Sequence, residues 1–141
     1  ASKYPKNIVG VKDSSYNLYE NLNIDNFSVL PGSESKLLKG LQSGCSGIIT
    51  ATCNATSELA RKVYEDFQKG NEQEVNQKLC DVRNEFEKYN LISGLHTFFG
   101  KSNNSYKNLL PPLSILNLKE AEQLNKNLEK LNFSTNSSMA A

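Results

Sequence analysis

Three short apolar runs, each bounded by turn-forming residues, shape the first third of the chain. They cover Ile8–Val11, Phe27–Leu30 and Gly47–Thr50. Short apolar runs without polar alternation are typical of strands that are covered on both faces of a sheet. Two helices are predicted between them, a weak one over Ser15–Leu22 and a clearer one over Ser35–Gln42 with leucines at helical spacing. This alternation predicts an α/β fold with a parallel sheet.

After the third run the pattern changes to longer helices. The first has apolar residues at steps of four on one face, Leu59, Val63 and Phe67. It is predicted to end at Gly70, and Asn71 with Glu74 forms a capping-box-like start for the next helix. The apolar face of that second helix comprises Val75, Leu79, Val82 and Phe86.

Two further helices are predicted in the last third of the chain. A short one covers Leu91–Phe99, and the last begins at a capping box formed by Asn117 with Glu120. The connector between them, Leu109–Leu113, contains two prolines and is predicted to be extended. The small polar tail from residue 134 to 141 is predicted to be disordered.

Composition and charge narrow the range of partners. The chain has 141 residues, of which 38% are hydrophobic and 22% charged, which suits one domain of ordinary size. The net charge of +1, with no basic stripe, argues against a nucleic-acid partner. No apolar run reaches the roughly 18 residues that a membrane span needs, so we expect no membrane partner.

The chain has three cysteines, an odd number, and their spacing fits neither a zinc site nor a disulfide framework. Reduced thiols are typical of a cytoplasmic protein, which is the location that we expect. The chain contains no P-loop, GxGxxG or HExxH motif. We therefore predict neither a metal ion nor a cofactor.

Lys12 is the strongest candidate for chemistry. It ends the first apolar run, and the carboxyl ends of parallel strands are where working residues gather. An amine in a dry pocket loses its charge more easily and can attack a carbonyl to form a Schiff base. The alternative is a strand-end lysine that points to water. Gly10, on the same strand face, either leaves room below Lys12 or permits a close helix contact.

The end of the second run offers further polar groups. Gly32 would let a substrate carboxylate approach the backbone amides, Ser33 would donate a hydrogen bond, and Glu34 would accept one from a hydroxyl. Ser33 has an equally simple alternative role as the cap of the following helix. His96, on an apolar stretch, is predicted to be structural.

These strand ends resemble those of the dihydrodipicolinate synthase and N-acetylneuraminate lyase family. The similarity is carried by Gly10-Val11-Lys12-Asp13-Ser14-Ser15, Pro31-Gly32-Ser33-Glu34, Gly47-Ile48-Ile49-Thr50-Ala51-Thr52-Cys53-Asn54 and Leu110-Pro111-Pro112-Leu113. It extends over nearly the whole chain.

The resemblance implies the C-terminal portion of a (β/α)₈ TIM barrel. Residues 1–56 would supply the last three strands, sixth to eighth, with their connecting helices. Residues 57–133 would supply the final barrel helix and a C-terminal helical extension. Three parallel strands alone leave two open edges, so this chain would be a fragment of a larger barrel or a small open α/β domain.

The resemblance also implies roles for individual residues. Lys12 would form an imine with pyruvate or another 2-oxo acid. Gly32, Ser33 and Glu34 match the region that contacts the acyl acceptor or the sugar-acid chain. Ile49 matches a residue whose backbone carbonyl lies near the lysine. The family's proton-shuttling tyrosine and carboxylate-binding loop belong to the first half of the barrel, so this chain alone is expected to be inactive.

We expect a class I aldolase that cleaves a 2-keto-3-deoxy sugar acid to pyruvate and an aldehyde, because Asp13-Ser14-Ser15 and Ser33 are more similar to the sugar-acid aldolases. The alternatives are dihydrodipicolinate synthase, which condenses pyruvate with aspartate semialdehyde in lysine biosynthesis, and N-acetylneuraminate lyase. A catalytically inactive interaction module is the alternative from a different class. The family resemblance implies a homo-oligomer, and exposed strand edges predict self-association of the fragment.

Overall fold

A computed structural model describes residues 1 and 3–134. Two parallel strands, β1 (Gly10–Asp13) and β2 (Ser28–Pro31), pair in register from Gly10 opposite Ser28 to Asp13 opposite Pro31. The 3₁₀ turn η1 (Glu34–Lys36) then leads directly into α1 (Leu37–Gln42). The predicted α/β class and the helix after the second strand are therefore confirmed.

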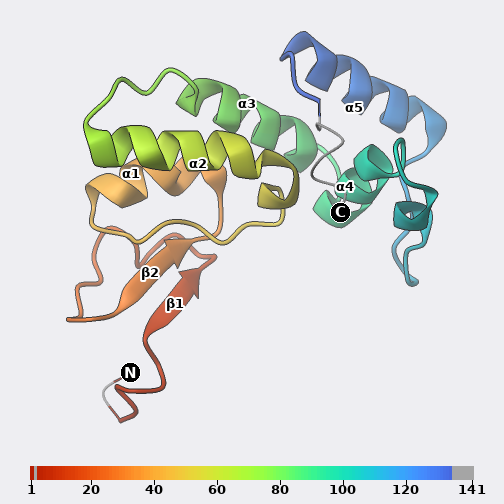
Figure 1. Ribbon diagram of the computed structural model, residues 1–141. Coiled ribbons are helices and arrows are strands. Elements are labelled where there is room, and N and C mark those ends of the chain that lie inside the picture. The colour runs from red at the N-terminus through yellow and green to blue at the C-terminus, as the bar shows by residue number, and fades with distance from the viewer. Residues whose placement is uncertain (2, 135–141) are drawn as a thin grey trace.

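The helices form most of the molecule (Figure 1). They are α2 (Cys53–Lys69), α3 (Asn76–Glu87), α4 (Leu91–Phe99) and α5 (Leu118–Lys130), with a second 3₁₀ turn, η2 (Asn104–Lys107), after α4. Helix α2 packs on α1 and on α3, whereas α5 packs on α3 and α4. The boundary predicted at residue 56 falls inside α2, and residues 135–141 of the predicted tail lie outside the described residues.

Local signals explain the helix ends. Gly70 ends α2 in the left-handed conformation with φ of 68°, which glycine adopts without strain. Asn117 and Glu120 form the predicted capping box of α5. By contrast, α3 begins five residues after Asn71, at Asn76, so the capping box predicted at Asn71 is wrong.

Two predicted elements are absent from the described residues. The segment 15–22 is a series of bends and turns rather than a helix. Gly47–Thr50 is not a strand, because a single backbone hydrogen bond joins it to β2, from the Ile49 N–H to the Pro31 carbonyl at 3.1 Å. The sheet in the described part of the chain therefore has two strands rather than three.

Three apolar clusters hold these elements together. The largest lies between α3, α4 and α5, and its buried members include Val82, Phe86, Phe98, Leu124 and Leu128. A second joins α1, α2 and α3 through Leu37, Leu41, Val63 and Leu79. A small third cluster of Tyr19, Val29 and Cys45 lies against the sheet. Within the described residues, no helix combines the length and the apolar character needed to cross a membrane.

Candidate functional site

The ends of β1 and β2 and the segment around Ile49 lie next to one another. The Gly32 N–H donates to the Asp13 carbonyl at 2.9 Å, and the Ile49 N–H donates to the Pro31 carbonyl at 3.1 Å. These bonds bring the three segments that carry the predicted site residues to one edge of the sheet.

Lys12 lies at this edge and is exposed. Its Nζ donates a hydrogen bond to the Ser14 Oγ at 3.0 Å. The same Ser14 oxygen would lie 3.4 Å from a Cβ built on Gly32, so Ser14 lies between the lysine amine and the glycine. The dry pocket expected around Lys12 is not formed by the described residues, and the amine faces solvent.

Gly10 is required for the close approach of the strands. A Cβ at this position would lie 2.8 Å from the Ser28 carbonyl oxygen on β2. Real Cβ atoms do not come this close to backbone, so a side chain here would push the strands apart. The glycine is thus explained by strand pairing, and not by the helix contact that the sequence suggested as one alternative.

Asp13, next to Lys12, organises the loop that replaces the predicted helix. Its buried carboxylate accepts from the N–H groups of Leu18 and Tyr19, both at 3.0 Å, and from the Ser15 hydroxyl at 3.0 Å. Burial alone would raise the pKa of Asp13, but these hydrogen bonds outweigh it and lower the pKa below its ordinary value. Because a helix would need the same N–H groups, this capture favours the loop.

Acid should therefore weaken the fold through Asp13. Its folded-state pKa lies below its unfolded value of about 3.9, so its stabilising contribution is present above that value and is lost as the pH falls through the folded-state pKa. We expect Asp13→Asn to reduce the pH dependence of stability in this acidic range. Urea denaturation of the wild type and of Asp13→Asn, at pH 7 and at about pH 3, measures the change in the free energy of unfolding with pH. The exposed Asp25→Asn is the control, and equal pH dependence in wild type and Asp13→Asn would contradict the assignment.

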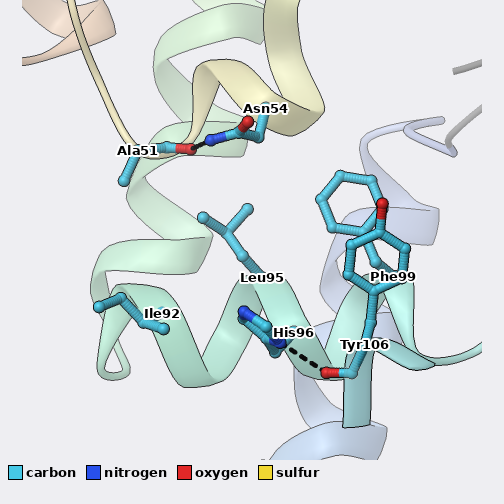
Figure 2. A pocket seen from close by; sticks show the side chains of 7 residues that line it. All are labelled: Ala51, Asn54, Ile92, Leu95, His96, Phe99 and Tyr106. Atoms are coloured by element: carbon cyan, nitrogen blue, oxygen red, sulfur yellow. Dashed lines mark hydrogen bonds between the residues drawn. The ribbon is translucent and has the colours of Figure 1, made fainter. Parts of the chain in front are cut away.

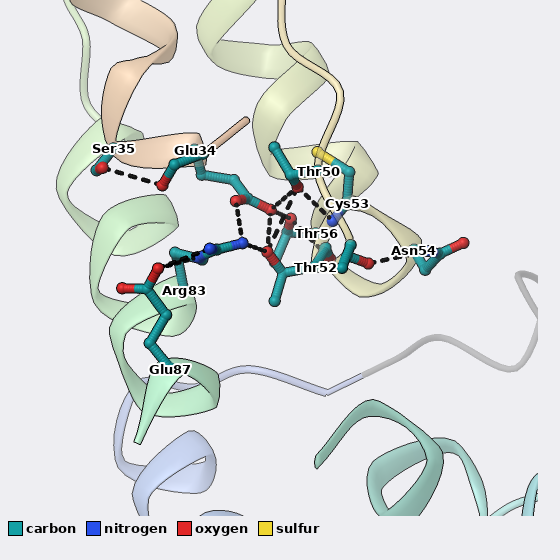
Figure 3. A network of polar contacts seen from close by, with 11 residues as sticks. Glu34, Ser35, Thr50, Thr52, Cys53, Asn54, Thr56, Arg83 and Glu87 are labelled. Carbon is teal, nitrogen blue, oxygen red and sulfur yellow. Dashed lines mark hydrogen bonds and ion pairs between the residues drawn. The ribbon is translucent and has the colours of Figure 1, made fainter. Parts of the chain in front are cut away.

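The structure places Glu34 inside the protein rather than at the opening of the site. Its side chain is fully buried, accepts from the hydroxyls of Thr50, Thr52 and Thr56, and forms an ion pair with Arg83 (Figure 3). All of these partners are internal, so the carboxylate is not placed to accept from a substrate hydroxyl. This corrects the substrate contact predicted for Glu34.

The remaining predicted residues differ in accessibility. Ser33 is buried, its Oγ lies 3.0 Å from the Ser35 Oγ, and it makes no side-chain cap to the following turn. The Gly32 amide is already used by Asp13, so it is not free for a carboxylate. Ile49 is 48% exposed, and none of the described residues donates a hydrogen bond to its carbonyl.

A cavity of about 330 Å³ lies between the start of α2 and helix α4 (Figure 2). It is lined by Ala51, Asn54, Ile92, Leu95, His96, Phe99 and Tyr106. The His96 Nδ1 lies 2.5 Å from the Tyr106 carbonyl oxygen and donates to it, which ties η2 to α4. This bond agrees with the structural role predicted for His96.

The cysteines are unsuited to nucleophilic chemistry. Cys45, Cys53 and Cys80 are free thiols, and burial raises the pKa of each one. A raised pKa reduces the thiolate fraction, and the thiolate is the reactive form.

The comparisons with known proteins agree with this fold. The dihydrodipicolinate synthase from Bacillus anthracis superposes with a TM-score of 0.77 at 20% identity, covering 88% of this chain and 45% of that one. The synthase from Thermotoga maritima superposes with a TM-score of 0.77 at 18% identity, covering 90% of this chain and 47% of that one. A prophage protein of the dihydrodipicolinic acid synthase family from E. coli K12, solved in complex with pyruvate, gives 0.70 at 20% identity, with 94% and 49% covered.

This chain thus spans about half the length of the solved structures that it matches. No match was found among curated proteins. Residues 2–131 match the model of the dihydrodipicolinate synthetase family, which confirms the resemblance seen in the sequence. The chain belongs to the dihydrodipicolinate synthetase family.

Proposed function

We propose that the protein containing this chain is a Schiff-base lyase in which Lys12 is the nucleophile. The observation that carries the proposal is the position of Lys12 near the carboxyl end of β1, where its Nζ donates to Ser14 and where Ser14 lies next to Gly32 at the end of β2. In parallel α/β folds this edge is where substrates bind. Family membership supports the same chemistry.

The solvent exposure of Lys12 is compatible with this role in a longer protein. The solved relatives contain about twice the length of chain, and the residues that this chain does not cover would supply the other walls of the pocket. The described residues alone leave the amine exposed to solvent and form no pocket around it. We therefore expect this chain by itself to lack activity.

In the proposed reaction the uncharged Lys12 amine attacks the 2-oxo carbon. The carbonyl oxygen leaves as water, and an imine joins the substrate to Nζ. For a 2-keto-3-deoxy sugar acid, the C4 hydroxyl loses its proton and becomes the aldehyde carbonyl as the C3–C4 bond breaks, and the protonated imine accepts the electron pair to form an enamine. The aldehyde departs, a proton adds to C3 of the enamine, and water then hydrolyses the imine to release pyruvate and restore the lysine.

The substrate that we favour is such a sugar acid, on the basis of Asp13-Ser14-Ser15 and Ser33. The second candidate is condensation of pyruvate with aspartate semialdehyde, which is favoured by the names of two solved relatives, both dihydrodipicolinate synthases. N-acetylneuraminate lyase is a third. Cleavage of 2-keto-3-deoxygluconate and consumption of aspartate semialdehyde, measured in parallel, would distinguish the first two.

Trapping tests the nucleophile directly. The chain is combined with the first half of the Bacillus anthracis barrel, incubated with pyruvate, reduced with borohydride and mapped by peptide mass spectrometry. We expect an adduct on Lys12 and none in Lys12→Arg, because a guanidinium cannot form this imine. The exposed Lys39→Arg is the matched control and should retain the adduct. An adduct on a different lysine, or none in a folded complex, would contradict the proposal.

We also propose that the isolated chain self-associates through its open sheet. Ile8, Val9 and Ile49 are 43%, 57% and 48% exposed beside strands with unpaired edges. Sedimentation velocity should show a concentration-dependent oligomer that Val9→Lys weakens. A monomer at all concentrations would contradict this proposal. One solved relative is described as a monomeric dihydrodipicolinate synthase variant, so a monomer is a realistic alternative outcome.

The free cysteines support a reducing, cytoplasmic location.

A further inference from the structure

We infer that Arg83, on α3, is a positioning residue that holds the Ile49 segment in place beside Lys12. The inference rests on the proposed function, in which Lys12 is the nucleophile, and on the family resemblance, which implies that the Ile49 carbonyl lies near that lysine. The sequence pattern gives no sign of this role for Arg83. The evidence for the role is a buried polar network that joins three separate parts of the chain (Figure 3).

The centre of this network is the Glu34 carboxylate. One oxygen, Oε1, accepts from Thr50 at 2.7 Å, from Thr52 at 2.5 Å and from Thr56 at 3.0 Å. The other oxygen, Oε2, lies 3.3 Å from the Arg83 guanidinium. A buried carboxylate needs partners of this kind, because an unpaired charge in the interior is strongly unfavourable.

Arg83 completes the network from the opposite side. Its side chain is only 5% exposed, and Nη1 donates both to Glu34 and, at 2.8 Å, to the Thr52 hydroxyl. The remaining nitrogens, Nε and Nη2, donate to Glu87 Oε1 at 2.8 and 2.6 Å. The rigid planar fork of arginine suits these several acceptors, and a lysine ammonium reproduces only part of the arrangement.

Two hydrogen bonds between the Pro31–Glu34 and Ile49–Thr50 segments connect this network to Ile49. Glu34 lies three residues after Pro31, and Thr50 follows Ile49 directly. The Thr50 hydroxyl binds Glu34 while the Ile49 N–H binds the Pro31 carbonyl, so the two segments are held at both points. Among the described residues a single backbone hydrogen bond joins Ile49 to β2, and Ile48 packs against the apolar cluster of α1, α2 and α3. The side-chain network adds a polar restraint at Thr50.

A positioning role predicts a local effect that differs from general destabilisation. In Arg83→Gln, hydrogen exchange of the Ile49 amide should accelerate about tenfold more than exchange of the Leu128 amide in the core of α5. Arg83→Lys should recover part of this protection. Val82→Ala, which alters a neighbouring buried residue of α3 outside the network, should change the two amides equally.

The catalytic readout uses the chain combined with the first half of the Bacillus anthracis barrel. Under saturating pyruvate, the rate of imine trapping on Lys12 should fall about 10- to 100-fold in Arg83→Gln and partly recover in Arg83→Lys. Thr50→Val, which removes one hydroxyl and keeps the ion pair, provides a second variant if Arg83→Gln does not fold. It should slow trapping and loosen Ile49 in the same sense.

The outcomes separate this inference from the proposed function. If wild type shows no adduct on Lys12, the proposed function fails. If wild type is trapped normally while both Arg83→Gln and Thr50→Val trap at the wild-type rate, or if Ile49 exchange changes only in step with Leu128, Arg83 has no positioning role. Selective loosening of Ile49 with slower trapping supports it.

Discussion

Replacing Arg83 by methionine should lower the free energy of unfolding by about 3–5 kcal/mol, which is the usual effect of removing one partner of a buried ion pair. The change leaves the Glu34 carboxylate fully buried, with the three threonine hydroxyls still donating to it. In the described part of the chain its charge would then lack the cation that pairs with it. Urea denaturation followed by circular dichroism gives the change in free energy.

The double variant Glu34→Gln/Arg83→Met separates loss of the ion pair from loss of packing. Because it removes both charges, it should be considerably more stable than Arg83→Met alone. Arg61→Met is the matched control for an arginine that is exposed and pairs with Glu65 on α2, and it should change stability by less than about 1 kcal/mol. If Arg83→Met and Arg61→Met are equally mild, the buried charge is not compensated by Arg83.

Phe86→Ala is expected to cost a similar amount, about 3–5 kcal/mol, for a different reason. Phe86 is fully buried at the point where α3, α4 and α5 meet. Its ring contacts Phe98 edge to face at 5.5 Å between centroids and lies against Gly94 of α4. Truncation to alanine leaves a cavity that surrounding helices fill only in part.

Phe67→Ala is the matched control on α2. Phe67 is half-buried at the edge of the second cluster, so the same truncation should cost clearly less. Chemical denaturation of both variants under the same conditions makes the comparison. Equal losses would mean that the cluster around Phe86 is not the main source of stability.

The sequence predicts the helical part of this fold well because its signals are local. The apolar periodicity and the flanking residues place α4 over Leu91–Phe99, as observed, and the Asn117–Glu120 capping box places the start of α5. Segment 15–22 fails for a reason that is also physical. The Asp13 carboxylate binds the N–H groups of Leu18 and Tyr19, and no propensity within the segment reveals this.

The candidate site was only partly visible in the sequence. Lys12 and Gly32 were identified from their places at strand ends, and the structure brings them to the same edge of the sheet. The partner of Glu34 is 49 residues away, in a helix whose apolar pattern gives no sign of a buried arginine. Burial of Glu34 was therefore not predictable from its position next to Gly32 and Ser33.

The contact between Glu34 and Arg83 has a consequence for cooperativity. It joins the segment of β1 and β2 to the helical segment, and helix α2 runs without interruption across the boundary drawn between them at residue 56. If either segment detached, Glu34 and Arg83 would each lose the partner of opposite charge. The two-stranded sheet is thus held in place by the helices, and we expect both parts to unfold in one transition.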